Sequence, residues 1–215
     1  MKRSLLAMLL IVPVSTAAPA LVVNIDYKDN NTPSLEEGFF DLTLGAARRA
    51  AFERALEIWT TQRDGTVELE INAQFNSLAS INILGAAGTE SYSANLSGLG
   101  NVVWYPAALA SQLHGSSLPA IDGPFLGFHM SAEFNSDRDT LALGAGRWYY
   151  GLDGNPPGTD KDFVTVALHE LGHAFGFGPL VNFSTGAWAF PFPKDFPDIF
   201  SKQLTRTPDP SGGPL

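Results

Sequence analysis

Residues 164–178 constrain the fold more than any other stretch, because they place three polar side chains in an otherwise apolar helical pattern. The stretch reads Val-Thr-Val-Ala-Leu-His-Glu-Leu-Gly-His-Ala-Phe-Gly-Phe-Gly. Residues four apart lie on the same face of a helix, so His169 and His173 point at one spot. Their neighbours are mostly apolar, which predicts a helix that is buried on most sides. Gly176 stands where the helical pattern stops.

Two imidazoles at this spacing can hold a zinc ion. Glu170 follows the first of them, where its carboxylate can reach a water on the metal rather than the metal itself. Zinc makes such a water more acidic, so Glu170 can act as the general base in attack on a carbonyl. The alternative is a helix whose histidines only fill polar positions, although burying them without a partner is costly. The pattern therefore predicts metal-assisted peptide hydrolysis.

The segment from His169 to Phe177 resembles the active-site helix of metzincin zinc proteases. It is most similar to that of leishmanolysin-like enzymes and their secreted bacterial relatives. In metzincins, a glycine at the position of Gly176 turns the chain towards a third zinc-binding histidine, and Pro179 occupies the position of that histidine here. In leishmanolysin-like enzymes the third histidine comes later, followed by a methionine turn. This chain has no histidine after His173 and no methionine after Met130, so either it ends before that segment or its site is incomplete.

The resemblance implies an α+β fold: a metzincin-like N-terminal subdomain in which a twisted mixed β-sheet packs on a long helix and a buried active-site helix. The residue pattern agrees with such a fold. Helical periodicity predicts the long helix at about 43–62, and strict alternation predicts a half-buried strand at 66–75. The other expected elements are strands at 21–27 and 102–105, a strand or two with long loops within 76–100, and helices at 106–113 and 196–204.

Residues 125–135 alternate between apolar and polar side chains and are expected to form another strand. In the related proteases, a strand shortly before the active-site helix forms the sheet edge above the cleft and pairs with the substrate. The resemblance therefore implies a substrate-binding edge strand that includes Phe128, His129, Met130 and Ser131, whose main chain would grip an extended peptide. The alternative is an ordinary internal strand. His129 would approach the metal only if the strand crossed the site.

A catalytic zinc site normally has three protein ligands, and the motif supplies two. Asp195 or Asp198, downstream of the helix, could complete an aspartate-type site. The favoured expectation is instead that the sequence is a catalytic N-terminal lobe, whose C-terminal lobe with the third histidine is absent or encoded elsewhere.

The loop at 144–159 and the residues after it offer one interpretation as a second metal site, because oxygen ligands at close spacing suit Ca²⁺. The candidate ligands are Asp153, Asn155, Asp160 and Asp162. The favoured alternative is turn and helix-cap chemistry, in which Asp160 or Asp162 caps the helix that follows.

Composition limits the partners and the chemistry. The net charge of −9 and the pI near 4.7 argue against nucleic acid or an anionic membrane as a partner. The chain has no cysteine, which excludes disulfides, thiol catalysis and thiolate metal sites.

The first 20 residues are typical of a secretory signal peptide. Lys2 and Arg3 precede an apolar run at 5–14, and small residues follow up to Ala20. We therefore expect a signal peptide at 1–20, a metalloprotease-like catalytic domain at 21–205 and a flexible tail at 206–215. No other segment is long and apolar enough to cross a bilayer, so the mature protein is expected to be exported and soluble, with no membrane contact after cleavage.

Taken together, these patterns predict a secreted zinc-dependent endopeptidase that hydrolyses polypeptide substrates. The alternative is a truncated or inactive protease-like remnant that binds at most a metal ion or a peptide.

Overall fold

The computed structural model describes residues 19–31, 38–94, 96, 103–118, 128–142, 145–181 and 197–203. They form an α+β fold around a four-stranded mixed sheet with the order β1 (Val23–Tyr27), β2 (Leu69–Asn76), β6 (Met130–Asn135) and β3 (Gly85–Thr89). The first three strands are parallel, and β3 runs antiparallel to β6. The predicted signal peptide, apart from residues 19 and 20, and the predicted tail at 206–215 lie outside the described residues.

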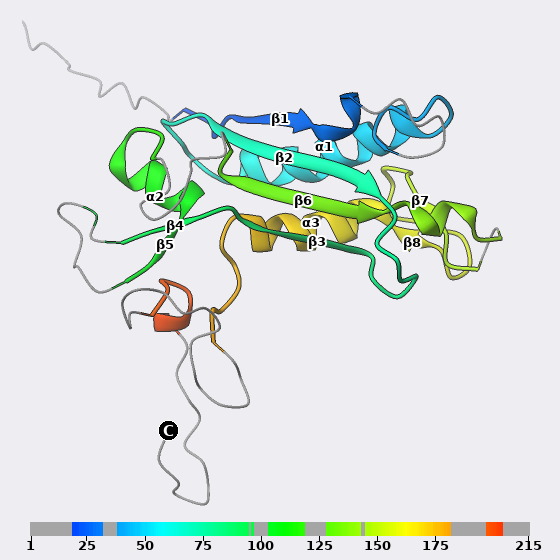
Figure 1. Cartoon of the computed structure of the whole chain (residues 1–215). Coiled ribbons are helices and arrows are strands. Elements are labelled where there is room, and N and C mark those ends of the chain that lie inside the picture. The colour runs from blue at the N-terminus through cyan, green and yellow to red at the C-terminus, as the bar shows by residue number, and fades with distance from the viewer. Residues whose placement is uncertain are drawn as a thin grey trace, which may run out of the picture.

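Two helices, α1 (Gly45–Thr61) and α3 (Phe163–Ala174), pack against each other and against the same face of this sheet (Figure 1). A third helix, α2 (Ala107–His114), lies at the end of the sheet where β2 begins (Figure 1). The remaining elements are the pairs β4 (Tyr92–Ser93) with β5 (Tyr105–Pro106) and β7 (Trp148–Tyr149) with β8 (Lys161–Asp162), and the 3-10 turns η1 (Lys28–Asn31), η2 (Ser136–Thr140) and η3 (Ser201–Gln203).

The core lies between the sheet and the two helices. In β2, buried residues alternate with half-buried ones, so one face of the strand points at the helices, as the sequence predicted. Aromatic rings fill the space: the ring of Phe134 lies 4.8 Å from that of Phe163 in α3 and 5.7 Å from that of Phe52 in α1. Large aromatic side chains contribute most of the apolar area that such a core buries.

One charged side chain lies inside this core. Arg48 of α1 is fully buried, and its guanidinium forms an ion pair with Asp139 at 2.7 Å. It also donates to the hydroxyl of Tyr150 (3.3 Å) and lies 4.3 Å from the ring centroid of Phe75. A buried charge is tolerated only when it is paired in this way, so the cluster ties the start of α1 to η2 and to the chain after β7.

The prediction that residues 125–135 form a sheet edge is wrong. β6 is an internal strand: Met130 pairs with Ile71 on one side and with Thr89 on the other, and Ser131 likewise has partners on both sides. Its main-chain groups are therefore committed to the sheet and cannot bind a substrate strand. The alternative of an internal strand holds, and among the described strands β1 and β3 are the edges.

The other expected elements differ mainly in their bounds. The long helix and the alternating strand occur within about three residues of the predicted ends, as α1 and β2. The helix expected at 106–113 is α2, which ends at His114 and is capped by Gly115 with a φ of 79°. The helix expected at 196–204 is reduced, within the described residues, to the single 3-10 turn η3. No helix in the described part of the chain is long and apolar enough to cross a membrane.

Candidate metal centre

The candidate centre is built on α3, and local sequence fixes where this helix begins. The carboxylate of Asp162 accepts a hydrogen bond from the backbone N–H of Thr165 (3.1 Å), which satisfies one of the free donors of the first turn. One face of the helix, with Phe163, Ala167, Leu171 and Ala174, is fully buried in the core. The histidines lie on the other side, so burial of the apolar face decides which way they point.

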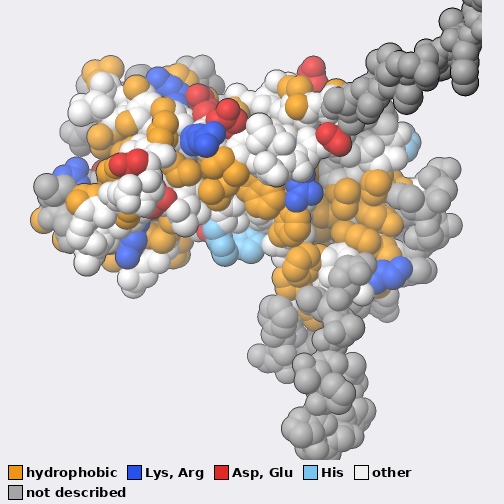
Figure 2. All heavy atoms as spheres, turned by 180° about the vertical axis from the view of Figure 1, so that it is seen from behind, with side chains coloured by type: hydrophobic (Ala, Val, Ile, Leu, Met, Phe, Trp, Pro, Cys, Tyr) orange, Lys and Arg blue, Asp and Glu red, His pale blue; other side chains and the backbone are white. Residues whose placement is uncertain are grey.

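His169 and His173 are exposed on this open face, and their Nε2 atoms lie 3.2 Å apart. Figure 2 shows histidine side chains grouped at the surface on the side seen from behind. Two imidazole nitrogens on one tetrahedral zinc ion, at Zn–N distances of about 2.0–2.1 Å, would be about 3.3–3.4 Å apart. The two nitrogens therefore have the separation and the chemical character of a zinc-binding pair.

The end of α3 fixes the ring of His173. Its Nδ1 lies 2.8 Å from the backbone carbonyl oxygen of Phe177. A carbonyl can only accept, so Nδ1 carries the proton of the neutral ring and Nε2 presents a lone pair. A hydrogen bond of this kind on the far nitrogen is the usual means of orienting a metal-binding histidine.

The carbonyl of Phe177 reaches His173 because the chain turns back sharply after α3. Phe177 N–H donates to the carbonyl of Gly172 (2.9 Å), and Gly176 N–H donates to the carbonyl of His173 (2.9 Å). This pair of bonds is a Schellman motif, and it requires a left-handed residue at Gly176, where φ is 96°. The ring of Pro106 packs closely against Gly176. A Cβ added at Gly176 would come within 2.3 Å of this ring.

Glu170 is half-buried and lies between the histidine face and the buried face of α3. At 100° per residue, it is offset by about 60° from His173 around the helix axis. Around the helix axis, Glu170 is therefore next to the histidine face and not in line with it. In the motif that the sequence predicts, a base that acts on a metal-bound water would occupy this position.

A third protein ligand is absent from the part of the chain that the structure describes, where no three His, Cys, Asp or Glu side chains gather as a metal-binding group. Asp195 lies outside the described residues. Asp198 is buried, and its carboxylate accepts hydrogen bonds from the backbone N–H groups of Leu180, Phe200 and Ser201 at 2.9–3.1 Å. Through these three bonds Asp198 anchors the chain after α3, and among the described residues it joins no metal-binding group.

His129 takes no part in the centre. It is buried beside β2, where Nδ1 accepts a hydrogen bond from the backbone N–H of Glu70 (3.0 Å), and Nε2 lies 3.1 Å from the hydroxyl of Ser117. Burial lowers the pKa of His129 from its ordinary value, against the opposing effect of the Glu70 carboxylate. Phe128 lies nearby under the ammonium of Lys28, 5.3 Å from the ring centroid.

The four candidate Ca²⁺ ligands have separate local partners. Asp153 accepts from the hydroxyl of Tyr149 (2.6 Å), and this bond lowers the pKa of the carboxyl. Asp160 accepts from the backbone N–H groups of Gly146 and Arg147, and Asp162 caps α3. Asn155 donates to the carbonyl of Asp153. These contacts are the turn and cap chemistry that the sequence favoured.

Sequence reasoning missed three residues that lie near the centre: Trp59, Arg63 and Phe177. Trp59 Nε1 donates to the carbonyl of Leu168 in α3 (2.9 Å). The rings of Trp59 and Phe177 are 5.5 Å apart, and the guanidinium of Arg63 lies over both. No side-chain motif signals this group, because its contact with His173 is made by the backbone carbonyl of Phe177.

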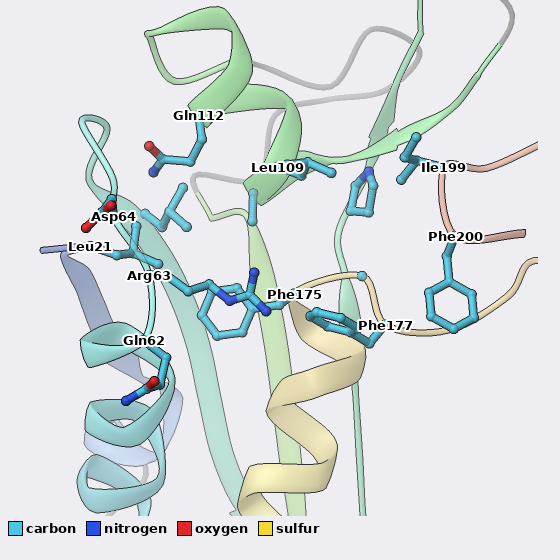
Figure 3. A pocket seen from close by; sticks show the side chains of 14 residues that line it. Leu21, Gln62, Arg63, Asp64, Leu109, Gln112, Phe175, Phe177, Ile199 and Phe200 are labelled. Atoms are coloured by element: carbon cyan, nitrogen blue, oxygen red, sulfur yellow. The ribbon is translucent and has the colours of Figure 1, made fainter. Parts of the chain in front are cut away.

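An apolar cavity of about 430 Å³ opens at the same end of α3 (Figure 3). Its walls come from the end of α1, the start of β2, α2 and the turn after α3. The side chains labelled in Figure 3 are Leu21, Gln62, Arg63, Asp64, Leu109, Gln112, Phe175, Phe177, Ile199 and Phe200. Phe177 thus belongs both to this cavity and to the surroundings of His173.

Comparison with known proteins adds no relative: no protein-family model, curated protein or solved structure matches the chain.

Proposed function

We propose that the chain is a secreted zinc-dependent endopeptidase in which His169 and His173 bind the metal and Glu170 is the general base. The observation that carries the proposal is the 3.2 Å separation of the two exposed Nε2 atoms, which matches a zinc-binding pair. The orientation of His173 by the Phe177 carbonyl supports it. When bound, zinc would polarise the scissile carbonyl and acidify a water molecule.

The roles of the protein groups follow from their places on α3. Glu170 accepts the proton of the attacking water and returns it to the leaving amine, for which it needs contact with water and freedom from strong partners. The apolar packing of α3 against the sheet holds this carboxylate and the two imidazoles in a fixed relation. The finer part of the expected fold, a metzincin-like N-terminal subdomain whose twisted sheet packs on a long helix and a buried active-site helix, belongs to this proposal.

Substrate binding is assigned to β3 in place of residues 128–131. β3 is an edge strand of the sheet, runs antiparallel to β6 and packs against α3. An extended polypeptide can add to such an edge through its main chain, largely independent of its sequence. The glycines and alanines of β3 leave this edge open to a backbone that approaches closely.

The test measures zinc content and hydrolysis in the same preparations. We expect about one zinc per chain in the unaltered protein, and cleavage of a quenched fluorescent peptide that is lost on chelation. Glu170→Gln should keep the zinc and lose the cleavage, whereas His169→Ala should lose both. Glu57→Gln, on the exposed side of α1, is the matched control and should change neither. A zinc-free protein, or full activity of Glu170→Gln, would contradict the proposal.

A second function is favoured by one observation: the described residues contain no third ligand, and Asp198 is engaged elsewhere. The chain would then be a protease-like remnant that binds a metal ion or a peptide without cleaving it. Stoichiometric zinc together with no hydrolysis of any casein or peptide substrate would select this alternative.

A further inference from the structure

The orientation of His173 depends on the position of one backbone carbonyl. Its Nδ1 meets the oxygen of Phe177 at 2.8 Å, while its Nε2 faces His169. If Phe177 moves, the Nδ1 proton loses its acceptor and the ring can turn or change tautomer. Gly178 adds a steric boundary, because a Cβ there would lie 3.2 Å from Nδ1.

Burial alone does not hold Phe177, since 43% of the residue is exposed. Its ring lies 5.5 Å from the ring of Trp59, and the guanidinium of Arg63 lies 4.9 Å from the Phe177 centroid and 5.2 Å from the Trp59 centroid. A cation over an aromatic face at such distances is attracted by the ring quadrupole. The guanidinium therefore joins the two rings into one stack, which Figure 3 shows in part beside the cavity.

Two members of the stack, Arg63 and Trp59, are held by hydrogen bonds. The backbone carbonyl of Arg63 accepts a hydrogen bond from Leu21 N–H (3.1 Å). The backbone N–H of Arg63 donates to the carbonyl of Thr60 at the end of α1 (3.3 Å). Trp59 is bonded to the carbonyl of Leu168, one residue before His169. The stack thus spans from a fixed point on α1 to the turn that follows α3.

We infer that Arg63 is a positioning residue for the metal centre, because its stack on Trp59 and Phe177 holds the carbonyl that orients His173. The inference builds on the proposed zinc function, but it also makes a claim about the metal-free protein. Arg63 favours the Nδ1–H tautomer of His173, with a lone pair on Nε2, before any metal arrives. Partners that orient a metal-binding histidine are typically worth about 10- to 100-fold in metal affinity, and Arg63 acts one contact further away.

The experiment uses the full chain and two readouts. Nitrogen-15 NMR of the metal-free protein gives the tautomer of His173, and competition with a chromophoric chelator gives the affinity for Zn²⁺. The variants are Arg63→Ala, which removes the cation, Arg63→Lys, which retains one, and Phe177→Ala, which keeps the carbonyl but removes the ring. Arg54→Ala is the matched control, since Arg54 is an exposed α1 arginine paired with Glu57 at 2.6 Å.

We expect Arg63→Ala and Phe177→Ala to populate the Nε2–H tautomer of His173 and to weaken Zn²⁺ binding about 10-fold. Arg63→Lys should restore part of both effects, and Arg54→Ala should change neither. Retention of a single Nδ1–H tautomer in Arg63→Ala would overturn the inference, even if stability or zinc affinity fell. If the unaltered protein bound no Zn²⁺, the proposed function would fail, and the tautomer measurement alone would still decide the role of Arg63.

Discussion

Replacement of Gly176 by alanine should destabilise the protein for two reasons that can be measured separately. At φ of 96°, an alanine has an unfavourable backbone conformation, which costs about 1–2 kcal/mol. Its Cβ would also come within 2.3 Å of Pro106 Cγ, and such overpacking costs about 1–3 kcal/mol more. We therefore expect Gly176→Ala to lower the free energy of unfolding by about 2–5 kcal/mol.

Urea unfolding of three glycine variants separates the two terms. Gly115→Ala has a positive φ of 79° but no atom within 4 Å of the new Cβ, so it should cost only the backbone term of about 1–2 kcal/mol. Gly88→Ala, which has neither feature, should change stability by less than about 0.5 kcal/mol. Equal losses in Gly176→Ala and Gly115→Ala would refute the proposed contact between the turn and Pro106.

Three further predictions concern buried polar groups. Arg48→Met should cost about 3–5 kcal/mol in urea unfolding, because it leaves the Asp139 charge unpaired, and adding Asp139→Asn should recover part of that loss. Asp198→Ala should cost at least about 2 kcal/mol, since three backbone donors lose their acceptor, and faster limited proteolysis would check it. Burial lowers the pKa of His129 in the folded protein, so as pH falls the His129 ring takes up a proton in the unfolded chain before it does so in the folded one. The free energy of unfolding should therefore fall as pH decreases below about 6.5. The check is urea unfolding of the metal-free protein at pH 7.5 and at pH 5.5. His129→Asn, which keeps an acceptor for the N–H of Glu70, should show a smaller difference in the free energy of unfolding between the two pH values.

The elements with a strong period could be predicted from the sequence. The alternation of β2 and the helical pattern of α3 are local, and burial of one face follows directly from them. The pairing of the two histidines was likewise predictable, because four residues on a helix set it regardless of the rest of the fold.

The position of each strand in the sheet was not predictable in the same way. Alternation shows that β6 is a strand but does not tell an edge strand from an internal one; the edge position was implied by the resemblance, and β3 pairs along that side of β6. Nothing in the glycine- and alanine-rich sequence of β3 marks it as a strand, since it has little side chain to pack. Asp198 shows a similar limit: a carboxylate near a metal motif suggests a ligand. Two of its three backbone donors, Phe200 and Ser201, are local, but only the folded chain brings the third, Leu180, to it.

The two candidate metal ligands lie on a single turn of one helix, and this bears on how metal uptake relates to folding. An unfolded chain keeps His169 and His173 close as well, so it retains some affinity for zinc. A ligand that also binds the unfolded state stabilises the native state by less than its native affinity implies. The sheet, in contrast, needs contacts between distant segments, such as Ile71 with Met130, and closing such contacts is slow. Zinc is therefore expected to have little influence on how fast the chain folds, and depleting it should leave an apoprotein that is still folded.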